Sequence, residues 1–321
     1  MLTLSAADVD RALTFDGLVE TLRKAFRDGA VQPVRHHHTV ERPDGAASTL
    51  LLMPAWNDLN AAGTSAGGYI GVKIVTVSPD NNQIGKPAVM GLYLLLDGRT
   101  GEPCALIDGQ RLTQWRTACA SALAATYLAR EDASRLLIVG AGALSRFLAK
   151  AHAAVRPISS IHIWNRTAAN AEKAAADLRA EGLKAEAAND LGGEIAKADI
   201  VSCCTITDTP LVKGALLKPG AHLDLVGGFT PAMREADDDA IRRATVFVDT
   251  RGGATKEAGD IVQPLASGVL KPEDIAGDLY DLARGNASGR ETAEEITLFK
   301  SVGAAIEDLA AGIAVYEKMR G

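Results

Sequence analysis

Apolar residues near the start of the chain recur at intervals of three and four, the spacing of one helix face. They are Phe15, Leu18, Val19, Leu22, Ala25 and Phe26. This spacing predicts an amphipathic helix over residues 16–28, ended by Gly29. Ser5, followed three positions later by Asp8, gives a capping-box pattern ahead of it. The chain is therefore expected to open with helical structure.

The next hundred residues change to the alternating, β-branched pattern typical of strands. Five segments carry it: residues 34–40, 49–53, 69–77, 91–96 and 104–108. Turn sequences such as Arg42-Pro-Asp-Gly45 and Asp97-Gly-Arg-Thr-Gly101 separate these segments. We expect an α+β region whose strands pair as a meander.

An alanine-rich helical pattern over residues 111–130 leads into a region where strand and helix patterns alternate. The expected strands are residues 136–140, 161–164, 184–187, 200–204, 221–226 and 245–248. The expected helices lie near residues 143–155, 168–181, 190–197 and 236–243. This alternation predicts an α/β fold with a doubly wound parallel sheet of the Rossmann type.

The tail from Glu291 to Met319 again has a helical pattern. A helix that follows a finished parallel sheet needs another surface for its apolar face, so we expect this tail to return to the first region. We therefore assign residues 1–112 and 291–321 to one α+β domain. Residues 113–290 form the second domain, built on the parallel sheet.

Bulk composition narrows the class of protein. The 321 residues carry a net charge of -6 and no basic run, which argues against nucleic-acid or anionic-membrane partners. No apolar stretch reaches the roughly 20 residues of a membrane span, and no positive segment of a signal peptide opens the chain. The four cysteines, which we expect to be buried and reduced in a cytoplasmic protein, are Cys104, Cys119, Cys203 and Cys204.

The most informative segment is an apolar run from Arg135 that ends in Gly140-Ala-Gly142, with an alanine-rich helix directly after it. A buried strand, a glycine turn and a helix start, in that order, are typical of a dinucleotide-binding unit. The glycines let a pyrophosphate approach the backbone, and the helix start offers free N–H groups. The predicted pyrophosphate contacts are Gly140, Gly142, Ala143, Leu144 and Ser145.

The next predicted strand, residues 161–164, ends where the adenine ribose of such a cofactor lies. Asn165, Arg166 and Thr167 follow it, without an acidic side chain. An acidic residue at this point favours NAD, whereas an arginine favours the 2′-phosphate of NADP. We predict that these three residues contact the ribose phosphate of NADPH, with NADH a weaker alternative.

Three basic residues stand out because their surroundings are apolar. Lys73 lies inside the predicted strand 69–77, and the local pattern leaves open whether it faces solvent or a pocket. Arg116 is expected to open a small-residue helix, where the helix dipole prefers anions, so its planar fork suits a ligand carboxylate. Arg35 begins a strand and carries no signal by itself.

Other polar clusters have simpler explanations. His36 and His38 share a strand face opposite His37, and no nearby cysteine or acidic cluster completes a metal site. We therefore predict no metal. Asp237-Asp-Asp239 fits the negative charge of a helix start. Cys203 and Cys204 lie at the carboxyl end of a predicted parallel strand, where open α/β sheets bind ligands. We expect both cysteines to pack near the cofactor without reacting.

Several segments together resemble the ornithine cyclodeaminase/μ-crystallin family, from Gln32 to Tyr316. The matching segments are Gln32–Arg35, Gly71–Lys73, Leu112–Ala118, Gly140–Gly142, Gly259–Asp260, Gly289–Arg290 and the long, specific block Glu295–Leu309. The resemblance implies a homodimer. It also implies that both chain ends form a substrate-binding and dimerisation domain, and that the residues between them bind the nicotinamide cofactor.

The resemblance further implies that Arg35, Lys73 and Arg116 bind the substrate carboxylate. Two arginines converging on a lysine would lower its pKa by like-charge repulsion. Lys73 is then suited to be the catalytic group that gives a proton to the substrate nitrogen. The remaining expected contacts are Thr230 in the substrate pocket and, for the cofactor, Thr117, Thr205 and Gly227.

One segment separates the reactions of this family. After the predicted strand 221–226 the chain reads Gly227-Gly-Phe229-Thr230-Pro-Ala-Met-Arg-Glu235. Cyclodeaminases and alanine dehydrogenases of the family carry an acid where Phe229 stands. A phenylalanine can neither accept a proton nor bind an ammonium group by charge. This chain therefore looks more like the members that reduce Δ1-pyrroline-2-carboxylate and related cyclic ketimines.

We expect an NADPH-dependent reductase of cyclic 2-ketimine carboxylates. Conversion of Δ1-pyrroline-2-carboxylate to L-proline is the first choice, and of Δ1-piperideine-2-carboxylate to L-pipecolate the second. The alternatives are an ornithine cyclodeaminase, which would release ammonia from L-ornithine with NAD, and a non-catalytic, crystallin-like NADPH-binding protein. Intact Arg35, Lys73 and Arg116 argue against the non-catalytic protein. An opine-type dehydrogenase acting on a larger amino acid also stays open.

Overall fold

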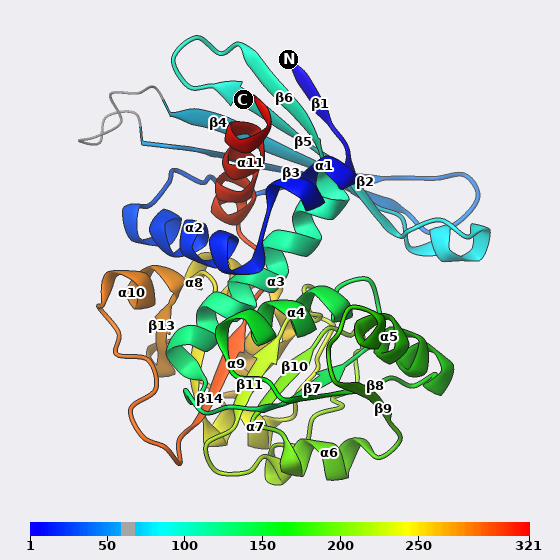
Figure 1. The fold of residues 1–321 in the computed structure, drawn as a ribbon, viewed down its shortest axis with the longest axis vertical. Coiled ribbons are helices and arrows are strands. Elements are labelled where there is room, and N and C mark those ends of the chain that lie inside the picture. The colour runs from blue at the N-terminus through cyan, green and yellow to red at the C-terminus, as the bar shows by residue number, and fades with distance from the viewer. Residues whose placement is uncertain (59–67) are drawn as a thin grey trace. The chain divides into compact units, whose positions relative to one another are not determined.

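The computed structural model describes residues 1–58 and 68–321 (Figure 1). The chain divides into two compact units. We call Met1–Arg116 with Ala304–Gly321 the terminal unit, and Thr117–Gly303 the central unit. Helix α3 (Gly109–Leu128) runs through the division between Arg116 and Thr117. The first and last helices of the chain therefore belong to the same unit.

The terminal unit is built on one sheet. Its strands are β1 (Leu2–Leu4), β2 (His36–Val40), β3 (Ser48–Trp56), β4 (Tyr69–Val77), β5 (Val89–Asp97) and β6 (Pro103–Asp108). Its other elements are α1 (Ala6–Ala12), α2 (Phe15–Asp28), the 3₁₀ segment η2 (Pro79–Ile84) and α11 (Ala305–Met319). Strands β2 to β6 pair antiparallel with their chain neighbours, which confirms the predicted meander. Strand β1, which the sequence did not predict, adds in parallel beside β6.

Local sequence determines how the first helices begin and end. Ser5 accepts a hydrogen bond from the backbone N–H of Asp8, and the Asp8 carboxylate accepts one from the backbone of Ser5, so the predicted capping box is present on α1. The Thr14 hydroxyl caps α2 by accepting a hydrogen bond from the backbone N–H of Gly17. Gly29, with a φ of 88°, ends α2 where the prediction put its end.

The register of the sheet sorts side chains onto two faces. Across β3, β4 and β5, the row Met53–Lys73–Tyr93 is buried on the face that α11 packs against. The adjacent row, Leu52–Ile74–Leu92, lies on the opposite face. There Ile74 is 39% exposed and Leu92 48% exposed. The strands therefore carry apolar side chains on both faces, and one of these faces is open.

The central unit is built on an eight-stranded parallel sheet. Its strands are β7 (Arg135–Val139), β8 (Ser160–Trp164), β9 (Ala185–Ala188), β10 (Ile200–Cys203), β11 (His222–Leu225), β12 (Ala244–Val248), β13 (Ile275–Asp278) and β14 (Ile296–Lys300). Its α-helices are α4 (Ser145–Val155), α5 (Ala168–Ala180), α6 (Leu191–Lys197), α7 (Asp238–Arg243), α8 (Arg251–Glu257), α9 (Gly259–Ser267) and α10 (Leu279–Arg284). Two 3₁₀ segments are η3 (Gly214–Leu216) and η4 (Pro272–Asp274).

The strand order β13-β12-β14-β11-β10-β7-β8-β9 confirms the doubly wound topology. The chain moves from β7 through β8 to β9 in one direction, then returns to β10 on the other side of β7. The carboxyl ends of β7 and β10 therefore flank a topological switch point, which is where open α/β sheets bind ligands. The glycine turn after β7 lies at this point.

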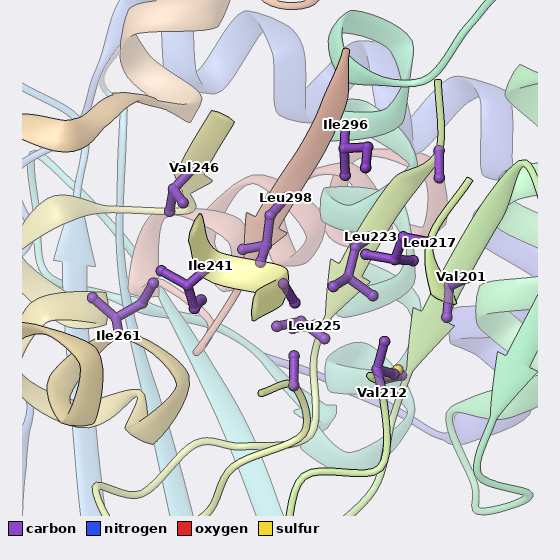
Figure 2. Packing of buried hydrophobic residues seen from close by; sticks show 14 of the residues in the cluster. Val201, Val212, Leu217, Leu223, Leu225, Ile241, Val246, Ile261, Ile296 and Leu298 are labelled. Atoms are coloured by element: carbon purple, nitrogen blue, oxygen red, sulfur yellow. The ribbon is translucent and has the colours of Figure 1, made fainter. Parts of the chain in front are cut away.

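Apolar side chains from several strands and helices form the core of the central unit (Figure 2). Val201 on β10, Leu223 on β11, Val246 on β12 and Leu298 on β14 are at most 1% exposed. Such continuous apolar strands are typical of a parallel sheet that is covered on both faces. The core fixes the strand ends that carry the candidate cofactor site.

The helix predicted in the tail from Glu291 to Met319 is present only in the second part of that tail. Residues Ile296–Lys300 form β14, which pairs with β11 on one side and β12 on the other. The helix of this tail, α11, begins only at Ala305, after Gly303 with its φ of 82°. Both β14 and the turn at Gly303 belong to the central unit, whereas the predicted boundary placed residues 291–321 with the first domain.

Further elements escaped the sequence analysis. Strand β13 and helices α8, α9 and α10 were not predicted, although the strands and helices expected between residues 135 and 250 are present within a few residues of their predicted bounds. Helix α3 begins at Gly109, so Arg116 lies inside it and not at its start. Among the cysteines, Cys119 and Cys203 are buried as expected, but Cys104 and Cys204 are partly exposed.

Candidate functional site

Lys73 lies at the centre of β4, on the face of the sheet that α11 packs against. Register places it between Met53 on β3 and Tyr93 on β5. Only 2% of Lys73 is exposed, because the pleat of the strand turns it away from the open face that Ile74 occupies. Of the two orientations that the sequence left open, the structure has the buried one.

The partner of Lys73 is a carboxylate to which the sequence analysis gave no role. Asp308, in the first turn of α11, has Oδ1 2.9 Å and Oδ2 2.7 Å from Nζ of Lys73. Arg116 donates from Nε to the same Oδ1 at 3.0 Å, and from Nη1 to Oε2 of Glu307 at 2.8 Å. All four side chains are buried. One carboxylate therefore joins the lysine to the arginine.

This environment lowers the pKa of Lys73 to about 8. Burial is the main cause, since it removes water from the ammonium group. The positive charges of Arg116 and Arg35 lower the pKa further, whereas Asp308 raises it. The direction matches the expectation from the sequence, but burial contributes more than charge repulsion. A lysine with this pKa holds its proton at neutral pH and can still release it.

Tyr93 lies beside Lys73 and is 1% exposed. Burial and the charge of Asp308 raise the pKa of its hydroxyl, so it stays protonated. Two glycines make room for the ring. A Cβ at Gly71 would overlap the Tyr93 hydroxyl, and a Cβ at Gly312 would lie 2.5 Å from Cε1 of the ring. The Tyr93 ring can therefore occupy this position only because residues 71 and 312 are glycines.

Arg35 directly precedes β2 and is half-buried. Its Nη1 lies 3.9 Å from Sδ of Met53, the cross-strand neighbour of Lys73. Arg35, Lys73 and Arg116 thus lie near one another in the terminal unit. Together with the acids Glu307 and Asp308, they carry three positive and two negative charges. The cluster has one positive charge in excess, which suits it to an anionic ligand.

The glycine turn of the central unit has the backbone that a pyrophosphate requires. Gly140 has a φ of 110°, a conformation that side chains rarely adopt, while Gly142 and Ala143 are exposed. No side chain caps the start of α4, where Leu144 is the N-cap residue. Ser145 begins this helix and donates from Oγ to the carbonyl of Gly142 at 2.7 Å. The open turn and uncapped helix start fit a dinucleotide phosphate.

The segment after β8 lies next to this turn. Asn165 accepts a hydrogen bond from the backbone N–H of Ala141 at 3.3 Å. Arg166 is exposed, and among the described residues no carboxylate pairs with it. Thr167 is the N-cap residue of α5, but its hydroxyl does not cap the helix. Asn165 also donates from Nδ2 to the carbonyl of Thr167 at 3.0 Å, so the exposed guanidinium of Arg166 carries the donors that this segment offers at the carboxyl end of β8.

The other predicted residues of the central unit lie at the carboxyl ends of neighbouring strands or in α3. Thr205 follows β10 and packs beside Gly140, while Gly227 follows β11. Thr230 and the partly exposed Phe229 lie in the loop after Gly227. Thr117 is buried in α3. The predicted substrate residues therefore divide between the units, with Thr230 in the central one.

The clusters that the sequence analysis set aside have structural explanations. His36, His37 and His38 are exposed along β2. Asp237 caps α7, whose first turn holds the next two aspartates. Burial raises the pKa of both thiols of Cys203 and Cys204, so these groups are protonated and poor nucleophiles.

Asp308 and Glu307 could have been suspected from the sequence. Two adjacent acids stand in a segment that is otherwise alanine, leucine and isoleucine, and buried carboxylates usually have a charged partner. What the sequence does not show is that this partner is Lys73, far away along the chain.

The helices in residues 1–58 and 68–321 include none with the length and hydropathy of a membrane span.

Comparison with protein families places these features in context. A model of the ornithine cyclodeaminase/mu-crystallin family matches residues 1–321. Protein SAR DEFICIENT 4 of Arabidopsis thaliana is 42% identical, over 93% of this chain and 92% of its own length. A Δ1-pyrroline-2-carboxylate reductase of Colwellia psychrerythraea is 35% identical, over 99% of each chain.

Two solved structures share the whole architecture. One is a Thermococcus litoralis Δ1-pyrroline-2-carboxylate reductase in complex with NADH and L-proline, with a TM-score of 0.92 and 33% identity over 99% of this chain and 97% of its own. The other is an archaeal alanine dehydrogenase dimer with bound NAD, with a TM-score of 0.88 and 28% identity over 99% of this chain and 95% of its own.

Proposed function

Because this chain belongs to the ornithine cyclodeaminase/mu-crystallin family of NAD(P)-dependent enzymes, we propose that it reduces a cyclic 2-ketimine carboxylate. Δ1-pyrroline-2-carboxylate, giving L-proline, is the first choice of substrate, and Δ1-piperideine-2-carboxylate, giving L-pipecolate, is the second. The observation that carries this proposal is the cluster of buried Lys73 and Arg116 with half-buried Arg35. Its single excess positive charge is matched by the one carboxylate of such an imine.

The two arginines bind the substrate carboxylate, and Lys73 serves the substrate nitrogen. Nζ of Lys73 donates a proton to the imine nitrogen as the C=N bond is reduced, because its pKa of about 8 leaves it charged yet able to give up the proton. Asp308 holds Nζ in place and supports the ammonium form. When bound, the reduced nicotinamide supplies the hydride to the imine carbon. Hydride and proton together convert C=N to CH–NH.

Phe229 favours imine reduction over cyclodeamination. L-ornithine brings a second amine that needs a charged partner or a base, and a phenyl ring offers neither. A cyclic imine enters with its C=N bond already formed and needs no such acid. The relatives named Δ1-pyrroline-2-carboxylate reductase support the same choice.

We propose NADPH as the preferred reductant, since Arg166 stands exposed after β8 where an acid would select NAD. Arg166→Ala should raise the KM for NADPH about tenfold or more and change the KM for NADH little. Steady-state kinetics with both cofactors would show this. An equal change for both would contradict a role for Arg166 at the 2′-phosphate.

The open sheet face of the terminal unit supports a homodimer. The neighbouring rows Leu52–Ile74–Leu92 and Pro54–Val72–Leu94 make an apolar surface across three strands. Exposed apolar patches of this kind mark protein interfaces, and the archaeal alanine dehydrogenase relative is a dimer. We propose that two copies of the chain pair through this face, and light scattering should give twice the mass of one 33.5 kDa chain.

The experiment that tests the function follows the absorbance of reduced nicotinamide. Purified protein is mixed with Δ1-pyrroline-2-carboxylate and with NADPH or NADH in parallel, and L-proline is identified as the product. Rapid oxidation with a preference for NADPH is the expected result. If neither cofactor is oxidised, the imine reductase proposal fails. Ammonia release from L-ornithine with NAD would then identify a cyclodeaminase instead.

A further inference from the structure

Three charged residues to which the proposed reaction gives no role meet in one buried cluster of the central unit. They are Glu235 from the segment after β11, Asp260 from the start of α9, and Lys300 from the end of β14. Each of the three side chains is 0% exposed. Nζ of Lys300 lies 3.2 Å from Oδ2 of Asp260 and 3.7 Å from Oε2 of Glu235. Buried charges at this density need a structural or functional reason.

The carboxylate of Glu235 joins two loops. Its Oε1 accepts hydrogen bonds from the backbone N–H of Thr205 at 2.7 Å and from the Thr205 hydroxyl at 2.8 Å. Its Oε2 accepts from the backbone N–H of Gly227 at 2.7 Å and of Gly228 at 3.2 Å. Thr205 follows β10 and Gly227 follows β11, two adjacent parallel strands. One side chain therefore fixes the distance between two loops at the carboxyl edge of the sheet.

Asp260 and Lys300 in turn fix Glu235. Oδ1 of Asp260 accepts from the backbone N–H groups of Glu235 at 2.8 Å and Ala236 at 3.0 Å. Lys300 shares a strand face with Leu298, which lies in the apolar core with Ile261, the neighbour of Asp260 (Figure 2). Lys300 is thus held on a strand of the apolar core, and its ammonium offsets part of the negative charge.

The fixed loops lie against the glycine turn. A Cβ on Gly140 would lie 3.0 Å from the carbonyl oxygen of Cys204 and 3.1 Å from Cγ2 of Thr205. The loop that Glu235 fastens is therefore in contact with the turn at the topological switch point. A shift of Thr205 would therefore move atoms that touch the glycine turn, where the pyrophosphate contacts are predicted.

We propose that Glu235 is a positioning residue for the nicotinamide cofactor, acting through the backbones of Thr205 and Gly227, with Asp260 and Lys300 as its supports. The inference rests on the cofactor part of the proposed function and not on the identity of the imine. It assigns a common purpose to the Gly227–Glu235, Gly259–Asp260 and Lys300 segments. Since no group of Glu235 touches the substrate or cofactor in this account, its effect appears in cofactor affinity.

The test compares Glu235→Gln with a matched variant at the other end of the same sheet. Asp199 directly precedes β10, is 6% exposed, and accepts hydrogen bonds from the backbone N–H groups of Ser134 and Arg135 at 2.9 Å each. Asp199→Asn makes the same change of carboxylate to amide at the amino edge, away from the glycine turn. Dissociation constants for NADPH and NADH are measured by fluorescence without substrate, and melting temperatures by circular dichroism.

Glu235→Gln should weaken binding of the better cofactor at least tenfold, because its amide N–H₂ group faces N–H donors on one of the two loops. Asp199→Asn should lower the melting temperature by about as much as Glu235→Gln lowers it. The dissociation constant for the cofactor in Asp199→Asn should stay within twofold of that of the unmodified protein. Equal affinity in Glu235→Gln and the unmodified protein overturns the proposal, as does an equal loss in both variants. Since no imine is present, a failure of imine reduction leaves this result unaffected.

If Glu235→Gln does not fold, Gly228→Ala takes its place. A methyl group at residue 228 would lie 2.6 Å from Oδ2 of Asp260, so either this loop or the Asp260 carboxylate that supports Glu235 must shift, while every carboxylate remains. Cofactor affinity should again fall at least tenfold. An unchanged dissociation constant in folded Gly228→Ala would show that neither the position of this loop nor its support by Asp260 controls cofactor binding, and would equally overturn the proposal.

Discussion

In the terminal unit, Lys73 and Arg116 face the carboxylates of Glu307 and Asp308, whereas in the central unit Lys300 faces Glu235 and Asp260. Both clusters are buried. The net charges of the two clusters have opposite signs. The terminal cluster, counted with Arg35, has one positive charge in excess, and the central cluster has one negative charge in excess. They differ also in what the carboxylates bind.

The carboxylates of the central cluster accept hydrogen bonds from backbone N–H groups, three at Glu235 and two at Asp260. Those of the terminal cluster bind the side chains of Lys73 and Arg116. Bonds to backbone hold loops in place, and bonds to cationic side chains aim those cations at a ligand. The same residue types therefore build a scaffold in one unit and, in the function we propose, a binding site in the other.

Replacing Lys73 tests the binding-site half of this comparison and should have the largest effect. Lys73→Met keeps the length of the side chain and removes the proton donor, so kcat should fall by about a thousandfold or more. The dissociation constant for NADPH should stay within about twofold. Asp308 keeps its bond to Arg116, so the fold should survive. Turnover and cofactor titration would check this, and kcat above a tenth of the unmodified value would remove Lys73 from the mechanism.

Replacing Lys300 tests the scaffold half. Lys300→Met leaves Glu235 and Asp260 buried without a cation, and removal of one partner of a buried ion pair typically costs about 3–5 kcal/mol. Urea denaturation should show a loss of that size. Lys73→Met is the matched control, since its carboxylate retains Arg116 and its loss should be clearly smaller. Equal losses of unfolding free energy in the two variants would mean that the lysine stabilises both clusters to the same extent.

The sequence predicted the elements whose pattern is local. The glycine turn, the capping box at Ser5 and the strand alternation each depend on neighbouring residues. The strand β14 was missed because the short apolar run Ile296-Thr-Leu-Phe-Lys300 was joined to the helical residues after Gly303, and such a run fits a buried helix as well as a strand. Its pairing with β11 and β12, from other segments of the chain, makes it a strand.

The same reason explains what was missed in the terminal unit. The sequence singled out Lys73, Arg35 and Arg116 as unusual, but the burial of Lys73 follows from the pairing of β3, β4 and β5. Its partner Asp308 comes from a helix at the other end of the chain. A cation in an apolar strand can be recognised locally. The carboxylate that makes its burial possible depends on tertiary structure.

The smallest effect, and the most specific, is expected from Asp308→Asn. In the reaction we propose, Lys73 acts in its charged form, so kcat/KM should fall as the pH rises through the Lys73 pKa of about 8. Asp308 raises that pKa, so removing its charge lowers it, and the alkaline limb should move to lower pH by roughly one unit. Activity below the new pKa should be affected less. The measurement is the pH profile of kcat/KM for both proteins.

Glu307→Gln is the matched control for this shift. Glu307 occupies the same turn of α11 and binds Arg116, but its charge is not among the main influences on the Lys73 pKa. In Glu307→Gln, the alkaline limb of the pH profile of kcat/KM should therefore stay at the same pH, even if the substrate KM rises. The ionisation of the imine itself is common to all three proteins and cancels in the comparison. A limb that does not move in Asp308→Asn, or that moves equally in Glu307→Gln, would mean that Asp308 does not act on Lys73 through its charge.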